Sequence, residues 1–195
     1  MTAKGGVGIL NCAHKLVITD PNIIGSWFKK LAPAHRNPGG ALYEFDLATV
    51  ISNIPNMPDT KKGAIKNSTF LISKLASNRG GSSNEYYLTI IDRKLAQQIN
   101  SIRWIPEPSN SGYWRNNARM AANYKLHQYV ENLNSVIVST GYDIHHVNFF
   151  TFDNRTDNLR VLTDSQHGAI DESFITPREE IKDDQDMIDF IKTVI

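Results

Sequence analysis

Three of the six histidines in this chain, His145, His146 and His167, lie in one short stretch. Histidine can take up a proton near neutral pH, and its neutral ring can bind a metal ion through a nitrogen. Three of them between Tyr142 and Asp171 therefore predict acid–base chemistry, metal binding or both. The alternative interpretation is a set of solvated surface side chains with no chemical role.

The first two of these histidines lie on a predicted strand. Residues 142–149 are rich in β-branched and aromatic side chains and follow Thr140 and Gly141, which is typical of a strand that starts after a turn. Neighbouring side chains on a strand point to opposite faces, so His145 and His146 cannot have the same role. We expect one of them to bind a metal ion and the other to act as a base.

The third histidine lies at the start of a predicted helix. Residues 153–155 are turn-forming, and residues 159–162 form a short second strand. Thr163 and Gln166 have the spacing of a capping box, which places His167 in the first turns of a helix. The order strand, loop, strand and helix would bring His167 and one histidine of the first strand around a single cation.

Four features occur in order along this stretch: the paired histidines, the Asp-Asn-Arg run at 153–155, the Asn-Leu-Arg run from Asn158, and the final Gln-His pair three residues after Thr163. Together they resemble the HNH endonucleases, also called ββα-metal or His-Me finger nucleases. The resemblance implies that His145 is a metal ligand and that His146 is the general base. It also implies that Asn158 ties the loop together and aims the base, and that His167 is a second metal ligand.

The resemblance implies one divalent metal ion per site, with Mg²⁺ as the first expectation. Many phage-type members have aspartate where this chain has His145, and imidazole favours transition metals, so Mn²⁺ and Zn²⁺ are alternatives. The nuclease colicins have a further histidine four residues after the last one, where this chain has Asp171. We expect Asp171 to contact the ion through water or through another ligand at most.

The activity implied is metal-dependent hydrolysis of DNA by an HNH endonuclease of the phage or homing type. His146 would take a proton from the attacking water, and the products would carry 5′-phosphate and 3′-hydroxyl ends. One such site nicks one strand, so a double-strand cut needs a homodimer or two events. Arg155 and Arg160 could hold flanking phosphates, or Arg155 could brace the turn. The alternative function is a non-catalytic DNA-binding or structural protein that uses the finger as a scaffold.

The composition is that of an ordinary soluble globular protein, with 41% hydrophobic and 21% charged residues. No apolar run is long enough to cross a bilayer, and the start lacks the apolar core of a signal peptide, so we expect a cytoplasmic protein with no membrane partner. The single cysteine, Cys12, excludes an internal disulfide and a four-cysteine zinc site. A metal ion would therefore be held by His, Asp, Glu or Asn.

Positive charge is concentrated in the first part of the chain. Residues 1–84 carry ten Lys and Arg against four Asp and Glu, whereas residues 171–195 carry three against eight. A basic segment is typical of a protein that contacts the phosphate backbone of nucleic acid. An incidental basic surface is an equally good account of charge alone.

The basic segment is predicted to be mainly helical. Apolar residues at helical spacing predict three short helices, at 21–31, 41–54 and 64–77. Such a module could bind DNA or pack in a dimer. The side chains expected to reach DNA are three lysines: Lys61, Lys62 and Lys66.

The run of glycine, serine and asparagine at 78–84 predicts a domain boundary. It separates a basic, mainly helical module at 1–84 from an HNH nuclease domain at 85–176, which is followed by an acidic C-terminal helix or tail at 177–195. The expected fold class is α+β, with a C-terminal ββα-metal nuclease domain after a small, mainly helical module.

A further histidine, His127, precedes the stretch from Tyr142 to Asp171, which we call the motif. It has no ligand partner at helical spacing, so a packed, hydrogen-bonded histidine is favoured over a catalytic one. The elements expected in this part of the chain are strands at 86–91, 102–105 and 113–117, a helix at 92–100, and a helical or strand-to-helix segment at 121–133.

Overall fold

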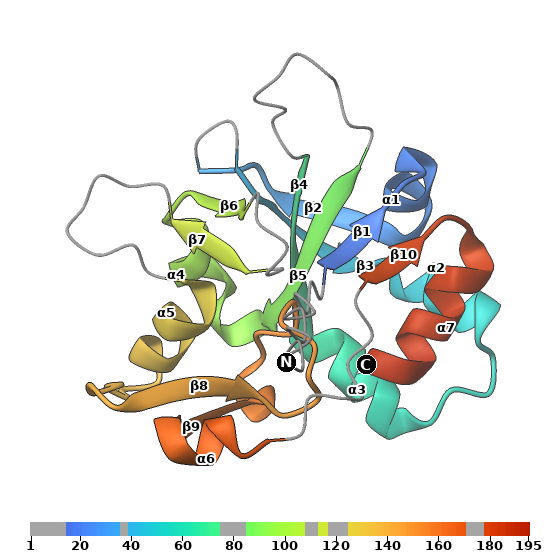
Figure 1. The fold of residues 1–195 in the computed structure, drawn as a ribbon. Helices are drawn as coiled ribbons and strands as arrows, with labels where there is room; N and C mark the ends of the chain where they lie inside the picture. The colour runs from blue at the N-terminus through green and yellow to red at the C-terminus, as the bar shows by residue number, and fades with distance from the viewer. Residues whose placement is uncertain (1–14, 36–38, 75–84, 108–112, 117–124, 171–177) are drawn as a thin grey trace, which may run out of the picture.

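The fold is built on a six-stranded sheet that draws strands from almost the whole chain. The computed structural model describes residues 15–35, 39–74, 85–107, 113–116, 125–170 and 178–195. Across the sheet the strand order is β10-β1-β5-β4-β3-β2 (Figure 1). Its strands are β1 (Lys15–Ile18), β2 (Phe28–Ala32), β3 (Ala41–Phe45), β4 (Ser68–Lys74), β5 (Tyr86–Asp92) and β10 (Arg178–Ile181). β1 and β10 are parallel, and the other neighbouring strands are antiparallel.

The centre of the sheet is buried on both sides. Every residue of β4 except Lys74 is buried, and so is every residue of β5 between its two ends. Alternate side chains of a strand face opposite sides, so Leu88 and Ile90 enter one core while Tyr87 and Ile91 enter the other. A sheet of this kind needs a covering layer on each face.

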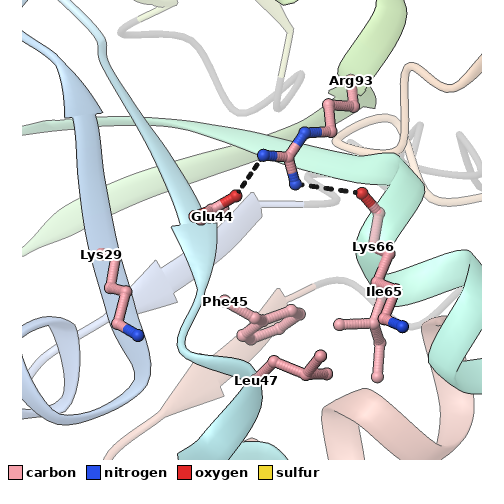
Figure 2. Close-up of a pocket in the computed structure, with 7 residues that line it drawn as sticks. All are labelled: Lys29, Glu44, Phe45, Leu47, Ile65, Lys66 and Arg93. Carbon is pink, nitrogen blue, oxygen red and sulfur yellow. Dashed lines mark hydrogen bonds and ion pairs between the residues drawn. The ribbon is translucent and has the colours of Figure 1, made fainter.

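Arg93, immediately after β5, ties three elements together (Figure 2). Its Nη2 lies 2.7 Å from Oε2 of Glu44 in β3, and its Nη1 donates to the backbone carbonyl of Lys66 at 3.3 Å. These contacts hold the C-terminal end of the helix α3 (Asp59–Asn67) beside β3 and β5.

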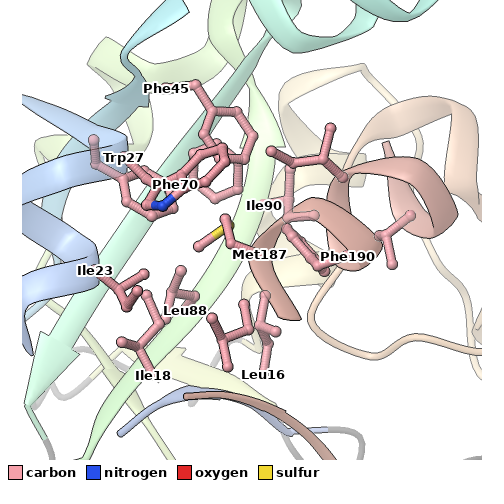
Figure 3. Close-up of a cluster of buried hydrophobic side chains, with 14 of the residues drawn as sticks. Leu16, Ile18, Ile23, Trp27, Phe45, Phe70, Leu88, Ile90, Met187 and Phe190 are labelled. Carbon is pink, nitrogen blue, oxygen red and sulfur yellow. The ribbon is translucent and has the colours of Figure 1, made fainter. Parts of the chain in front are cut away.

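Four helices cover one face of the sheet: α1 (Pro21–Trp27), α2 (Leu47–Asn53), α3 (Asp59–Asn67) and α7 (Asp184–Val194). Met187 and Phe190 of α7 lie among sheet side chains that include Leu88 and Ile90 (Figure 3). Removing these apolar surfaces from water is the main contribution to the stability of this layer.

Aspartate side chains start three of these helices. Asp20 and Asp46 each accept a hydrogen bond from the amide two residues later, at 2.9 and 3.0 Å, and Asp183 accepts one from the amide three residues later at 2.9 Å. Such caps satisfy amide groups that the first helical turn leaves without a partner. Asp20 before Pro21 therefore marks the start of α1, as the sequence predicts.

The other face is covered by short elements around the motif: the 3-10 turn η1 (Arg93–Leu95), α4 (Ala96–Asn100), α5 (Leu126–Leu133), the hairpin of β6 (Trp104–Pro106) with β7 (Trp114–Asn116), and the hairpin of β8 (Tyr142–His146) with β9 (Leu159–Thr163). Gly40 packs closely here, because its amide donates to the carbonyl of Trp104 at 2.8 Å and a Cβ on it would lie 2.8 Å from the Trp114 ring. Only glycine fits between the hairpin and the sheet.

The prediction of a mainly helical N-terminal module is wrong for the described residues. The first two predicted helical segments contain α1 and α2, and the third contains the end of α3, but each also contains all or most of a strand: β2, β3 or β4. The physical reason is that a strand buried on both faces reads as a continuous apolar run, which periodicity cannot distinguish from a buried helix. In β4 the apolar run is Phe70, Leu71 and Ile72, and every residue of this strand except Lys74 is buried.

The sheet joins residues from both sides of the predicted boundary at 78–84. β4 and β5 pair along their whole length, from Ser68 opposite Asp92 to Lys74 opposite Tyr86. The C-terminal segment also contributes, because β10 pairs with β1. The α+β class is confirmed, and one sheet is common to all three predicted segments.

The elements predicted before the motif are confirmed. The expected strand at 86–91 is β5, the expected helix at 92–100 is η1 with α4, and the two expected short strands are β6 and β7. The described part of the helical or strand-to-helix segment predicted at 121–133 is α5, and the C-terminal segment ends in the helix α7. None of the helices in the described ranges combines the length and apolar character needed to span a membrane.

Candidate active site at the paired histidines

The motif folds as strand, loop, strand and helix. β8 and β9 form an antiparallel pair, and α6 (Asp164–Gly168) follows directly, below the six-stranded sheet in the view of Figure 1. Thr163 Oγ1 accepts a hydrogen bond from the amide of Gln166 at 3.2 Å, and Gln166 Oε1 accepts one from the amide of Thr163 at 3.0 Å. The predicted capping box is therefore present and directs the chain from β9 into the helix.

The outer face of β8 brings His145 and His167 together. Their ring centres lie 5.5 Å apart, and both side chains are partly exposed. Two imidazoles bound to one metal ion through nitrogens at about 2 Å have ring centres about 5 Å apart. The observed separation suits a shared cation with only a small adjustment of the side chains. Arg160 lies directly across from His145 on β9 and is exposed.

The inner face of β8 holds His146 in a buried setting. Its side chain is 4% exposed, and its Nε2 lies 3.2 Å from Oδ1 of Asn154. The ring also packs against His127 of α5 with centres 5.4 Å apart, and against Tyr113 with centres 6.2 Å apart. The two neighbouring histidines therefore face different surroundings, as their positions on a strand predict.

Asn158 bridges the loop between the two strands of the motif. Its Oδ1 accepts a hydrogen bond from the amide of Asn148 at 2.9 Å, and its Nδ2 donates to the carbonyl of Asp153 at 2.8 Å. These bonds join the start and the end of the loop, which is the bridging expected of this asparagine. The side chain is buried, so water does not compete for the bonds.

The same loop is docked on the central sheet. The amide of Ile90 donates to the carbonyl of Phe152 at 2.8 Å, and the amide of Asn154 donates to the carbonyl of Ile90 at 2.9 Å. Phe152 enters the core under α7. The motif loop is therefore held against β5 by backbone bonds as well as by a buried aromatic ring.

Arg155 braces this loop rather than facing solvent. Its guanidinium contacts both carboxylate oxygens of the buried Asp153, at 2.8 and 2.6 Å, and donates to the carbonyl of Val194 at 2.8 Å. Burial alone would lower the pKa of Arg155, but its hydrogen bond to Asp153 and the charges of Asp153, Asp92 and Asp157 outweigh burial and raise it. Of the two roles considered from the sequence, the geometry favours the bracing role over phosphate binding.

His127 is packed against the candidate base, as expected of a buried histidine. Its side chain is 3% exposed, and its ring centre lies 5.0 Å from that of Tyr113. Burial, and then the charges of His146 and Lys125, lower the pKa of His127 well below the usual 6.5. The ring is therefore neutral at physiological pH and adds bulk without charge beside His146.

The three lysines predicted to reach DNA differ in their settings on α3. The ammonium of Lys61 contacts the backbone carbonyls of Ile191 and Lys192 at the end of α7. Lys62 forms an ion pair with Asp59 at 2.9 Å. Lys66 lines the rim of a pocket of about 200 Å³.

That pocket lies away from the histidines, between β2, β3 and the end of α3 (Figure 2). Its apolar floor comes from Phe45, Leu47 and Ile65, and its rim carries Lys29, Lys66, Arg93 and Glu44. Glu44 pairs with Arg93, and Lys29 lies 3.2 Å from Asp46, so most of the rim charge is already neutralised.

Asp171 lies outside the described residues. Among the residues that are described, no three His, Cys, Asp or Glu side chains gather closely enough to form a metal site. The pair of His145 and His167 is therefore the part of the predicted ligand set that can be placed, and it leaves room for water and phosphate oxygen around a cation.

Comparison with known protein families, curated protein sequences and solved structures finds no match for this chain. The site therefore has to be interpreted from its own geometry.

Two residues close to His146 are missed by the sequence patterns. Asn154 belongs to the turn-forming Asp-Asn-Arg run and has no role of its own in the sequence analysis, although its side chain contacts the candidate base. Thr89 reads only as part of a strand, although Nδ2 of Asn154 donates to its hydroxyl at 2.7 Å. A signal is present for Thr89, because a lone hydroxyl in the apolar run of β5 needs a buried partner.

Proposed function

We propose that this protein is a metal-dependent DNA endonuclease of the HNH type. The observation that carries the proposal is the arrangement around β8: two facing imidazoles, His145 and His167, on one side and a third, His146, on the other. Asn158 bridges the loop that separates the strands. A random set of surface histidines has no reason to combine this order of elements with a buried central asparagine.

The histidines divide into two roles. His146 takes a proton from water while the water oxygen attacks phosphorus in line, and the bond from phosphorus to the 3′ oxygen breaks. A divalent cation held by His145 and His167 would supply positive charge to the phosphate oxygens and to the departing 3′ oxygen. Mg²⁺ is the first candidate, and two imidazole ligands also suit Mn²⁺ or Zn²⁺.

DNA is proposed as the substrate on the basis of position and charge. Arg160 is exposed beside His145, where a guanidinium can contact a phosphate next to the one that is cut. The basic N-terminal segment would add contacts to the backbone, with ten Lys and Arg against four Asp and Glu in residues 1–84. One site acts on one strand, so nicking is the expected product of a monomer.

A second candidate function is a DNA-binding or structural protein that keeps the finger as a scaffold. The burial of His146, 4% exposed and bonded to Asn154, favours it, because a base must be reached by water. The pairing of His145 with His167 has no role in such a scaffold, which is why the nuclease is preferred.

A plasmid nicking assay separates the two functions. Purified protein is incubated with supercoiled DNA in Mg²⁺, in Mn²⁺ and in EDTA, and His146→Ala is run beside the wild type. Metal-dependent nicking that is lost in the variant supports the nuclease. No nicking with any divalent cation, together with clear DNA binding, would favour the scaffold, and equal nicking by the variant would remove His146 as the base.

A further inference from the structure

A chain of three hydrogen bonds runs from the backbone of the motif loop to the candidate base. Thr89 Oγ1 donates to the carbonyl of Phe152 at 2.7 Å. Asn154 Nδ2 donates to Thr89 Oγ1 at 2.7 Å, and Asn154 Oδ1 lies 3.2 Å from Nε2 of His146. These hydrogen bonds link Thr89 of β5 to Asn154, 65 residues later in the sequence, and through Asn154 to His146 of β8.

The first link sets the direction of all the others. The Phe152 carbonyl can only accept, so the single hydroxyl hydrogen of Thr89 is used there. The oxygen of Thr89 must then accept from Asn154, and only the amide nitrogen of Asn154 can donate. That nitrogen also faces the carbonyl of Thr151 at 3.4 Å, a second acceptor that requires the same orientation. The oxygen of the Asn154 amide is therefore turned toward His146.

We propose that Thr89 and Asn154 are positioning residues that select the tautomer of His146. Because Asn154 presents an oxygen, the neutral ring of His146 carries its hydrogen on Nε2, and the lone pair that accepts a proton lies on Nδ1. The catalytic part of this inference rests on the proposed nuclease function, whereas the choice of tautomer does not.

Burial makes this selection effective. Thr89 is 0% exposed, Asn154 is 1% exposed and His146 is 4% exposed, so water does not compete for the three bonds. The rings of His127 and Tyr113 pack on His146 and limit its rotation. In a buried chain of this kind, reversing one group would leave two donors or two acceptors facing each other.

The three hydrogen bonds also determine which nitrogen of His146 takes up the proton from the attacking water. When His146 accepts a proton on Nδ1 from the attacking water, the ring becomes a cation that still donates from Nε2 to the oxygen of Asn154. A hydrogen bond to an ionised group is stronger than one to a neutral group, so Asn154 stabilises the protonated ring more than the neutral ring. The same bond thus orients the base and helps it to hold the proton.

The experiment measures the tautomer directly. Nitrogen NMR of ¹⁵N-histidine-labelled, metal-free protein, at a pH where the ring is neutral, distinguishes a protonated Nε2 from a protonated Nδ1. The wild type is expected to show His146 as the Nε2–H form. An Nδ1–H form in the wild type would overturn the proposal, whether or not the protein cuts DNA.

A matched pair of variants tests the role of Thr89. Thr89→Ser keeps the hydroxyl and is expected to keep both the tautomer and the nicking rate. Thr89→Val keeps the shape but loses the donor, and a mixture of tautomers is expected with kcat lowered about 10-fold to 100-fold at nearly constant KM. Unchanged tautomer and kcat in Thr89→Val would overturn the role of Thr89.

Asn154→Asp tests the proposal without a substitution in β5, so it remains informative if Thr89→Val fails to fold. A carboxylate can still accept from Nε2, so His146 is expected to remain the Nε2–H form. A switch to Nδ1–H in this variant would overturn the proposal. If the wild type shows the expected tautomer but no divalent cation supports nicking, the proposed nuclease fails while the selection of the tautomer stands.

Discussion

The outer and inner faces of β8 hold their histidines in different ways. On the outer face, His145 and His167 are partly exposed, and their rings lie 5.5 Å apart. On the inner face, His146 is 4% exposed and is bonded through Nε2 to a buried asparagine. Successive positions on one strand thus carry the same residue type in an accessible setting and in an enclosed one.

The difference matches what each task requires. A metal ligand must be reached by the ion and by phosphate oxygens, and the ion itself orients the ligands once it is bound. A general base must have its lone pair aimed before the substrate arrives, so its orientation has to come from the protein. Accessible ligands and a base that the protein orients therefore fit the proposed nuclease, whereas the 4% exposure of His146 is the feature that favours the scaffold.

The largest expected effect is the loss of the enclosed base. His146→Ala removes the proton acceptor, and general base catalysis typically contributes a factor of about 10² to 10⁴, so nicking should fall about 1000-fold. Single-turnover nicking in Mg²⁺ or Mn²⁺ measures it. His35→Ala, at an exposed histidine outside the motif, serves as control. A rate within tenfold of the wild type would mean that the inner face does not carry the base.

The next largest effect is expected on the outer face. His145→Ala and His167→Ala each remove one of the two paired imidazoles, and Mn²⁺ affinity should fall about 100-fold while the fold is retained. Calorimetric titration with Mn²⁺ measures this without relying on activity. Nicking by these variants should recover as the metal concentration is raised, whereas His146→Ala should not recover. Wild-type Mn²⁺ affinity in both variants would remove the metal role from the outer face.

A third prediction concerns the ring packed behind the base. The pKa of His127 is lowered in the folded protein, so the unfolded chain binds the proton first as pH falls. Its contribution to stability is therefore full above the usual value of 6.5 and is lost below it, by about 1.4 kcal/mol per pH unit.

His127→Phe keeps a ring against Tyr113 and His146 but cannot bind a proton. Urea unfolding at pH 7 and at pH 5 should show a smaller loss of stability for this variant than for the wild type. His35→Phe, at an exposed site, should show the wild-type loss. Equal pH dependence in all three proteins would mean that His127 does not resist protonation.

The local features of the motif could be predicted from the sequence because they depend on near neighbours. The capping box of Thr163 and Gln166, the order strand, loop, strand and helix, and the opposite orientation of His145 and His146 all follow from patterns a few residues long. The bridging by Asn158 came from the resemblance to HNH nucleases and joins residues at most ten apart.

The features that could not be predicted depend on distant parts of the chain. Thr89 and Asn154 are 65 residues apart, and their contact exists only because the motif loop docks on β5. The strand β4 was predicted as helix because burial on both faces of a sheet erases the period that identifies a strand. The strand β2 is largely exposed, and it follows α1 without a break in the sequence that would mark the change from helix to strand. The contacts of Arg155 and Lys61 with the end of α7 could not be predicted either, because α7 is far from both residues in the sequence.

The smallest expected effect is on DNA binding. It compares Arg160, which is exposed on the outer face of β8 and β9, with Lys61, which already contacts backbone carbonyls. Arg160 lies across from His145 and is exposed, so Arg160→Ala should weaken DNA binding about fivefold and reduce the slope of log affinity against log salt by about one. Lys61→Ala should leave the slope unchanged, because its ammonium already contacts backbone carbonyls of α7. A fluorescence titration of labelled duplex at several salt concentrations measures both variants. The same change of slope in both would show that charge alone, and not position on the outer face of β8, determines contact with the phosphate backbone.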